Sequence, residues 1–346
     1  MKERNRYIDV VRGIAVILMV FGHCIQYGNG AEFSKPENFF YNKLFQIIYS
    51  FHMPLFMLLS GYLFAFTARK IQKTGEFIKN RFSRILLPIM GWQAIMKGIA
   101  LIREGEINRG FLVDYICSWV REFWFLWAIL YSSVVVFLVR KYLKDCIWVY
   151  LLGFVLTFWI PDIIYNLEYY KFMYPYFIIG YLFAEHLEAW KTKWTSVTVK
   201  YFFLLSVLLW GILFAFWNYD AFIYTSRYTL LGKANPQYQF GIDIYRMVTG
   251  LAGGSMVTSG MWLLYHSKLR SNPMFEVISR LGRESLGIYI ISGYLVGWFL
   301  IGYAEYYSFS YSGNVIETIV IIGVSYLCTI LLKKIRVTNC VLLGGR

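Results

Sequence analysis

The sequence predicts an all-α membrane protein, a bundle of about ten transmembrane helices, and two features of its composition point to this fold class. Apolar residues make up 58% of the 346 residues and charged residues only 16%, so the chain is more apolar and less charged than an ordinary soluble domain. The apolar residues also gather into runs of about 17 to 25 residues, the length at which a helix crosses a bilayer. Water therefore cannot be the main solvent of this chain.

Ten apolar runs, separated by polar breaks, give the predicted elements in chain order. The first run follows the basic stretch from Lys2 to Arg6, but it lacks the small-residue cleavage site of a signal peptide, so we interpret it as a retained span. The fifth and sixth runs are the shortest. The predicted spans lie near residues 8–28, 43–66, 84–102, 120–139, 146–160, 172–186, 200–218, 243–265, 284–303 and 315–332.

The loops between the runs are short, and we find no linker, repeat or soluble domain, so residues 1–346 are predicted to form a single membrane domain. The longest external segment covers roughly residues 218–242. It either folds over a site that opens outward or serves as a plain connection. Gly250, Gly253 and Gly254 in the eighth span fit close helix packing better than a phosphate-binding loop.

Ten spans place both termini on the same side of the membrane, and the distribution of cations predicts which side that is. Lys and Arg are concentrated at the N-terminus, in the even-numbered loops and in the C-terminal tail, whereas the last external loop, residues 303–314, has none. The positive-inside rule therefore predicts a multi-pass protein of the plasma or inner membrane with both termini in the cytoplasm. The same pattern accounts for the net charge of +14 without a nucleic-acid partner.

The first span carries three ionisable side chains, each of which needs a reason, because an Arg or Asp at the bilayer centre costs roughly 2.5 to 3.5 kcal/mol. Asp9 and Arg12 are three residues apart, hence on one helix face, and can pair near the cytoplasmic end. His23 lies eleven residues beyond Arg12, about 16 Å further along the helix and toward the outer half of the bilayer. Structural roles and roles in a functional site are both open for these residues.

Polar residues also stand in the second and third spans. His52 lies two residues before Pro54, where it either serves backbone groups freed by the proline or belongs to a site. Arg81 and Arg84, at the cytoplasmic start of the third span, suit a polyphosphate, because Arg binds phosphate oxygens through two parallel hydrogen bonds. The positive-inside bias alone would also place arginines there.

Short motifs surround these polar residues along nearly the whole chain, and the most specific is an Arg, ten residues and a His in the first span. The motifs are Tyr7–Ala15 with Gly22-His23, Phe51–Phe56 leading to Ser60–Leu63, Phe77–Pro88 around the arginine pair, Trp124–Leu126 and Ser285–Tyr289. With these motifs the sequence resembles the acyltransferase-3 family of membrane proteins, especially the branch similar to sugar O-acetylases. One departure is that the histidine many members place near Ile291 and Ser292 is absent.

The resemblance implies an acyltransferase that takes acetyl-coenzyme A or another acyl-coenzyme A as donor and a hydroxyl of a cell-surface polysaccharide or lipid-linked sugar as acceptor. Arg81 and Arg84 would hold the donor phosphates at the cytoplasmic mouth, and Arg12 would lie along the channel toward His23. His23 would act either as the general base or as a covalent acyl carrier. His52, expected at a similar depth in the next helix, would orient His23 or the acceptor. No metal is predicted, because the five cysteines lack metal-ligand spacing.

Two other classes stay open at this point. A transporter or flippase of a glycolipid or small polar substrate would also carry Arg, Asp and His within the membrane, although inverted halves with paired broken helices are not evident. A sensor or regulator built on this membrane domain is also compatible with the sequence. Membrane lipid is an expected partner, and nothing in the sequence indicates an oligomeric state.

Overall fold

The computed structural model describes residues 5–28, 30–33, 35–104, 109–162, 165–187 and 194–345, and the regular secondary structure within these ranges is entirely helical. This confirms the predicted all-α fold. Several helices begin after a residue whose side chain accepts a hydrogen bond from the first turn, as Asn5 and Asn42 do. The helices are α1 (Arg6–Tyr27), α2 (Pro36–Phe39), α3 (Lys43–Ala68), α4 (Thr74–Arg81), α5 (Leu87–Glu104), α6 (Arg109–Arg121), α7 (Trp124–Leu143), α8 (Ile147–Thr157), α9 (Leu167–Glu185), α11 (Ser196–Ala215), α12 (Ile223–Ser226), α13 (Pro236–Tyr265), α14 (Pro273–Arg283), α15 (Ser285–Leu295), α16 (Tyr311–Lys334) and α17 (Arg336–Leu343).

All ten predicted spans fall on helices, but the helices are not equally suited to crossing a membrane. Within the described ranges, seven are long and apolar enough to do so, and α14 with α15 and the turn after it would make an eighth. The two runs that are shortest in the sequence are absent from this set. Helix α8 has only 11 residues, and α9 buries Glu168 and Lys171. A multi-pass membrane protein is supported, whereas the count of ten and the cytoplasmic termini stay predictions.

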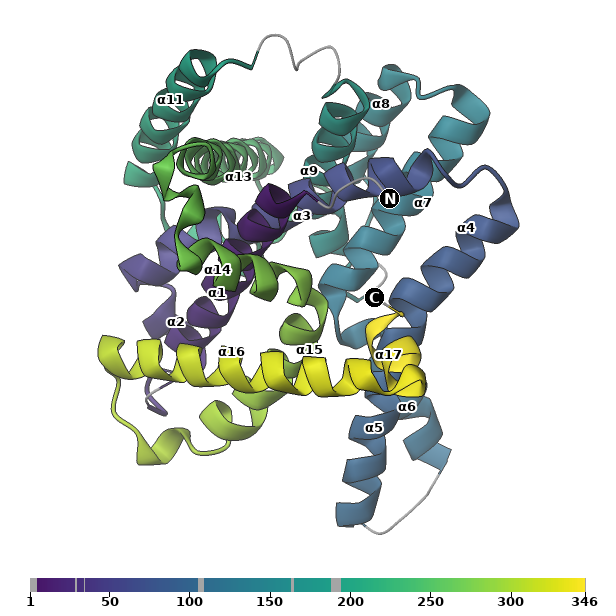
Figure 1. The fold of residues 1–346 in the computed structure, drawn as a ribbon, viewed down its shortest axis with the longest axis vertical. Helices are drawn as coiled ribbons and strands as arrows, with labels where there is room; N and C mark the ends of the chain where they lie inside the picture. The colour runs from purple at the N-terminus through teal and green to yellow at the C-terminus, as the bar shows by residue number, and fades with distance from the viewer. Residues whose placement is uncertain are drawn as a thin grey trace.

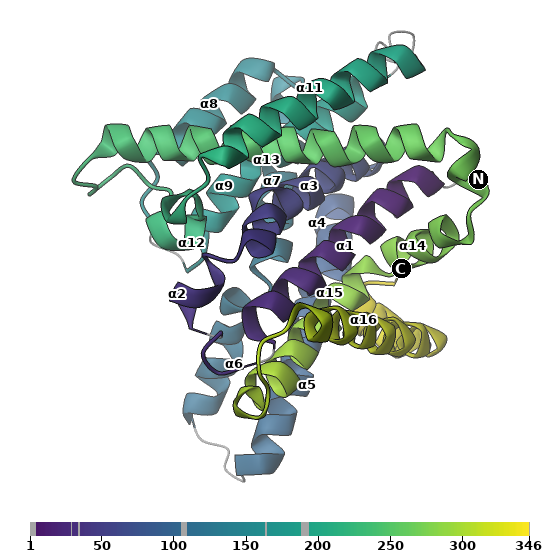
Figure 2. The ribbon, with the colours of Figure 1, turned by 90° about the vertical axis from the view of Figure 1, so that its left-hand side faces the viewer.

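The two ends of the chain lie on one side of the bundle, which we call the terminal side. Figure 2 shows both termini at its right and α2 and α12 at its left. Helix α1 starts on the terminal side, so Arg12 lies near that side and His23 lies further toward α12. A chain that crosses a membrane an even number of times must have both ends on one side.

Glycines let the central helix α3 approach its neighbours closely. A methyl group at Gly61 would collide with the backbone of α9, and one at Gly180 would collide with the backbone of α3. On another face of α3, the small residues Gly250, Gly253 and Gly254 of α13 leave room for Pro54 and its neighbours. The predicted packing role of these three glycines is confirmed. Small residues at such contacts are typical of helices that associate within a membrane.

Two helices are interrupted at positions that face a common cavity. Residues 82–86 form a π-helical turn between α4 and α5, and the chain bends by 77° between α14 and α15. Figure 1 shows α16 running across α15 toward α17, which lies beside α5. Irregular backbone at membrane depth is tolerated where protein covers it or where it lines a cavity, and π-helical turns often mark functional sites. Both breaks border one cavity, because Arg84 and Ser285 line it.

Candidate active site

A cavity of about 440 Å³ opens between helices α1, α3, α4, α7, α14, α15 and α16 and the π-helical turn. We call it the cationic cavity, because five of its lining residues are positively charged. These five are Arg12, Arg81, Arg84, Arg283 and Lys333. The remaining lining residues are mostly apolar: Met19, Met53, Phe56, Leu59, Ser60, Leu63, Phe64, Thr67, Ile85, Phe125, Leu126, Ile129, Ser285, Leu286 and Tyr289.

The two arginines predicted to bind phosphate occupy different environments in this cavity. Arg81 is buried, and its guanidinium lies 5.0 Å from the ring centre of Phe64 and 5.8 Å from that of Phe77. Its Nη2 donates to the Asn80 side chain, while its Nε is buried without a hydrogen-bond partner in the described structure. Arg84 is exposed in the π-helical turn. Arg81 therefore belongs to the packed wall of the cavity, not only to its mouth.

Arg12 links α1 to the bend between α14 and α15. Its Nη2 donates to Ser285 Oγ over 2.5 Å, and its Nη1 lies 3.9 Å from Asp9 Oδ1. The predicted pairing of Asp9 with Arg12 is thus present. Ser285 begins α15 and the motif Ser285–Tyr289, so two motifs far apart in the sequence meet at this hydrogen bond.

Arg283 and Lys333 complete the cationic set, and the sequence alone did not identify them. Arg283 ends α14 and lies 3.5 Å from Glu276, and Lys333 near the end of α16 lies 2.7 Å from Glu284. In the sequence Arg283 belongs to the cations of an inner loop and Lys333 to those of the C-terminal tail, and the positive-inside rule explains both without a site. One signal was present, because Arg283 stands two residues before the Ser285–Tyr289 motif.

The second predicted histidine, His52, is fully buried in α3 with a defined hydrogen bond. Its Nδ1 lies 2.9 Å from the carbonyl oxygen of Ile48, and it must donate there, because a carbonyl oxygen only accepts. In the neutral ring this leaves Nε2 as an acceptor that can take a proton. Pro54 removes the N–H that would bind the carbonyl of Ser50, not that of Ile48. His52 therefore does not fill the place that the proline leaves open.

His23 stands on α1 next to the part of α3 that carries His52. The preceding residue, Gly22, faces the ring of Tyr49, whose centre is 4.6 Å from that of His52. His23 is half-buried. The structure thus places the two histidines on facing parts of neighbouring helices, while their catalytic roles stay predictions.

A second, smaller cavity of about 30 Å³ adjoins His52 on the side of α12, and we call it the histidine cavity. Met53 lines both cavities, so His52 stands next to the boundary between them. Part of the long segment 218–242 forms the wall away from the terminal side. The structure places part of this segment against a cavity, while the opening of a site to the outside stays a prediction. The lining residues are Tyr49, Ser50, His52, Met53, Pro54, Trp124, Tyr169, Phe172, Met173, Trp217, Ala221, Phe222, Ile223, Tyr224 and Arg246.

The position where the resembling family often has a histidine is closed in this chain. Ser292 in α15 is fully buried, and its hydroxyl donates to the carbonyl of Tyr289 over 3.3 Å. An ionisable group is therefore replaced by a packed hydroxyl. Of the two predicted histidines, His52 lines the histidine cavity, whereas His23 is not among the lining residues of either cavity.

Comparison with known proteins agrees with this arrangement. The sequence profile described as "Acyltransferase domain", of the acyltransferase-3 family, matches residues 5–334. The chain is 27% identical over 300 residues to "Nodulation protein NolL" of Sinorhizobium fredii, covering 84% of this chain and 78% of that protein. It is 24% identical over 299 residues to "Nodulation protein NolL" of Mesorhizobium japonicum, covering 84% and 76%. No solved structure matches the chain. Because the profile spans both cavities and all of the predicted site residues, the chain belongs to the acyltransferase-3 family and is an acyltransferase.

Proposed function

We propose that this enzyme transfers an acyl group, in the first instance acetyl, from cytoplasmic acyl-coenzyme A to a hydroxyl of a cell-surface polysaccharide or lipid-linked sugar. It would do so in the plasma or inner membrane, with both termini in the cytoplasm. The observation that supports this most directly is the gathering of five cations from four separate parts of the chain around one cavity on the terminal side. Family membership favours this enzyme over a transporter or flippase.

The cationic cavity suits the chemistry of the donor. Coenzyme A carries several phosphates at one end and its thioester at the end of a long arm. Arg81 retains an unpartnered buried N–H, and charge-assisted bonds from such a guanidinium to phosphate are among the strong hydrogen bonds of proteins. Apolar residues such as Met19, Met53 and Phe56 line the rest of the cavity and would cover the arm. Held this way, the thioester would point toward the histidines.

The histidine pair suits transfer to a hydroxyl. In this scheme His23 takes the proton of the acceptor hydroxyl, whose oxygen attacks the thioester carbonyl, and the carbon–sulfur bond breaks. The proton then passes to the departing thiolate of coenzyme A. His52, fixed through Nδ1 to the backbone, keeps Nε2 as a free acceptor in the neutral ring and would use it to orient His23 or the acceptor. A two-step route, in which His23 carries the acyl group, uses the same residues and differs in showing ping-pong kinetics.

Transfer can be tested directly by comparing the ester-linked acetate on surface glycans of cells with and without the gene. Loss of a defined set of esters on deletion, restored by the wild-type gene, is expected. The purified protein should also release coenzyme A from acetyl-coenzyme A when the isolated glycan is added. An unchanged ester pattern together with acetylation of a soluble cytoplasmic acceptor would contradict the proposal.

A further inference from the structure

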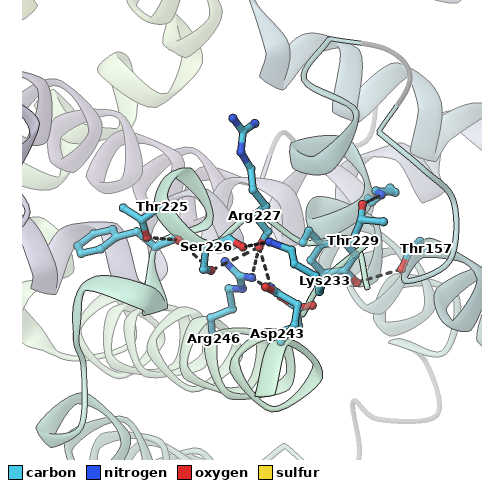
Figure 3. Close-up of polar contacts among 12 residues, drawn as sticks. Thr157, Thr225, Ser226, Arg227, Thr229, Lys233, Asp243 and Arg246 are labelled. Atoms are coloured by element: carbon cyan, nitrogen blue, oxygen red, sulfur yellow. Dashed lines mark hydrogen bonds and ion pairs between the residues drawn. The ribbon is translucent and has the colours of Figure 1, made fainter. Parts of the chain in front are cut away.

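A second polar cluster lies inside α13, next to the histidine cavity. Asp243 and Arg246 stand three residues apart, and each is only 1% exposed. Arg246 Nη2 donates to Asp243 Oδ1 and to the carbonyl of Arg227, and Figure 3 shows Arg246 reaching from α13 toward both partners. The spacing repeats the Asp-x-x-Arg of Asp9 and Arg12. A charged pair buried in an apolar helix is costly, so such pairs usually mark a function.

The hydrogen bonds of this pair are incomplete. Arg246 Nε and Nη1 and Asp243 Oδ2 are all buried without a hydrogen-bond partner among the described residues. The other oxygen, Asp243 Oδ1, accepts from Arg246 and also from Gln239 Nε2 over 3.0 Å. The unpartnered atoms are therefore N–H donors and a carboxylate acceptor. A hydroxyl group is the ligand that satisfies both kinds, because it donates and accepts.

Arg246 lines the histidine cavity together with His52, and Asp243 lies behind it, bound to Arg246 Nη2. The walls between them are largely aromatic, formed by Trp124, Trp217, Tyr224 and their neighbours. Aromatic walls with a few convergent polar groups are typical of small-ligand sites. The cavity volume of about 30 Å³ equals the share of one water in the liquid, so it takes a hydroxyl and the adjoining edge of a sugar rather than a whole ring.

The charges around the cavity favour a neutral ligand. Arg246 is the charged residue that lines the cavity, and Asp243 neutralises it. Lys233 is a further cation nearby, but it does not line the cavity, and its ammonium donates to the Ser226 carbonyl at 2.7 Å. An acidic sugar would thus gain little net attraction here. The other ion pairs of this cluster are Lys171 with Asp162 at 2.7 Å and Arg227 with Glu168 at 2.5 Å.

We propose that Arg246 and Asp243 form the acceptor subsite of this enzyme and hold a hydroxyl of a neutral sugar next to His52. The inference rests on the proposed acyl transfer and adds the chemical class of the acceptor. The hydroxyl accepts from Arg246 Nε or Nη1 and donates to Asp243 Oδ2. The rest of the sugar extends toward the 221–224 segment that closes the cavity.

The test measures equilibrium binding of methyl glucopyranoside and methyl glucuronide to the purified full-length protein by saturation-transfer NMR, with coenzyme A binding measured on the same samples. The double variant D243N/R246Q keeps a polar side chain at both positions, shorter at 246, and removes both charges. It should bind methyl glucopyranoside about tenfold more weakly or worse, because hydrogen bonds to charged groups are lost, and it should bind coenzyme A as the wild type does. R246K keeps the positive charge but not the planar guanidinium with its several N–H donors, so it should show the same loss of glucoside binding.

The control D162N/K171Q removes a neighbouring ion pair whose residues do not line the cavity, and it should bind both ligands normally. Wild-type glucoside affinity in folded D243N/R246Q and R246K, or an equal loss in the control, would overturn the subsite. At least tenfold tighter binding of the glucuronide would overturn the neutral class. A wild-type protein that binds the glucoside but never transfers acetyl would instead refute the proposed function and leave the sugar site standing.

Discussion

Removing the two predicted phosphate-binding arginines should weaken donor binding by an amount that their burial allows us to estimate. Arg81 is buried, so its hydrogen bond to a phosphate is expected to contribute roughly 1.5–3 kcal/mol. Arg84 is exposed, so solvent screening reduces its contribution to about 0.2–1 kcal/mol. The sum of roughly 2–4 kcal/mol predicts that R81Q/R84Q binds coenzyme A about 30- to 700-fold more weakly, with most of the loss due to Arg81.

Isothermal titration of the detergent-solubilised protein with coenzyme A measures this effect, and pantetheine serves as a ligand without the phosphates. Pantetheine affinity should be unchanged in R81Q/R84Q. The control K97Q removes a cation of α5 that pairs with Asp114 and does not line the cavity. Arg81 also covers the rings of Phe64 and Phe77, so R81Q/R84Q should lose some thermal stability. This differs from the expectation for two arginines that only supply charge at the cytoplasmic mouth of the cavity. Wild-type coenzyme A affinity in a folded R81Q/R84Q would refute the reasoning.

Other predictions follow from the same structure. R283Q and K333Q should each weaken coenzyme A binding severalfold without affecting pantetheine, and unchanged binding in both would remove them from the donor site. A cysteine that replaces the exposed Tyr306 should react with an impermeant reagent from outside the cell. A cysteine at the C-terminus should react only after permeabilisation, and the reverse pattern would contradict the predicted orientation. Gly61→Val should lower the melting temperature through a clash worth about 1–3 kcal/mol or more, while G211A, where a methyl group meets no neighbour, should not.

Much of the candidate site was predictable because its residues stand in compact motifs. The spacing of Arg12 and His23 fixes their separation along one helix, and the sequence also anticipated the contact of Arg12 with Asp9. Arg81 and Arg84 were placed at one opening although a π-helical turn changes the helix geometry between them. Ionisable residues within an apolar span can be recognised in the sequence, because each of them needs a partner or a cavity.

The rest depends on tertiary contacts that local patterns do not encode. Arg283 and Lys333 resemble ordinary loop cations until the 77° bend and the end of α16 bring them to the same cavity. Asp243 and Arg246 have the spacing of Asp9 and Arg12 but do not stand out in the sequence, because they lie at the start of the predicted eighth span, where charges are common. The number of membrane crossings could not be predicted from the sequence either, because the length of a short apolar run such as α8 does not show whether that run crosses the membrane.

The histidine pair allows a test that separates a catalytic from a structural role for each ring. H23Q should lower kcat by about 10²- to 10⁴-fold, because the general base is lost, without weakening coenzyme A binding. H52N keeps a donor near the Nδ1 position, so it can still bind the Ile48 carbonyl, but it removes the Nε2 acceptor. We therefore expect a large part of the activity of H52N to be lost while its thermal stability stays near that of the wild type.

His266 makes the same bond to a carbonyl four residues earlier and lines neither cavity, so H266N is the matched control and should be fully active. Full activity in H23Q would remove the proposed base, and full activity in H52N would leave His52 as a residue that only braces α3.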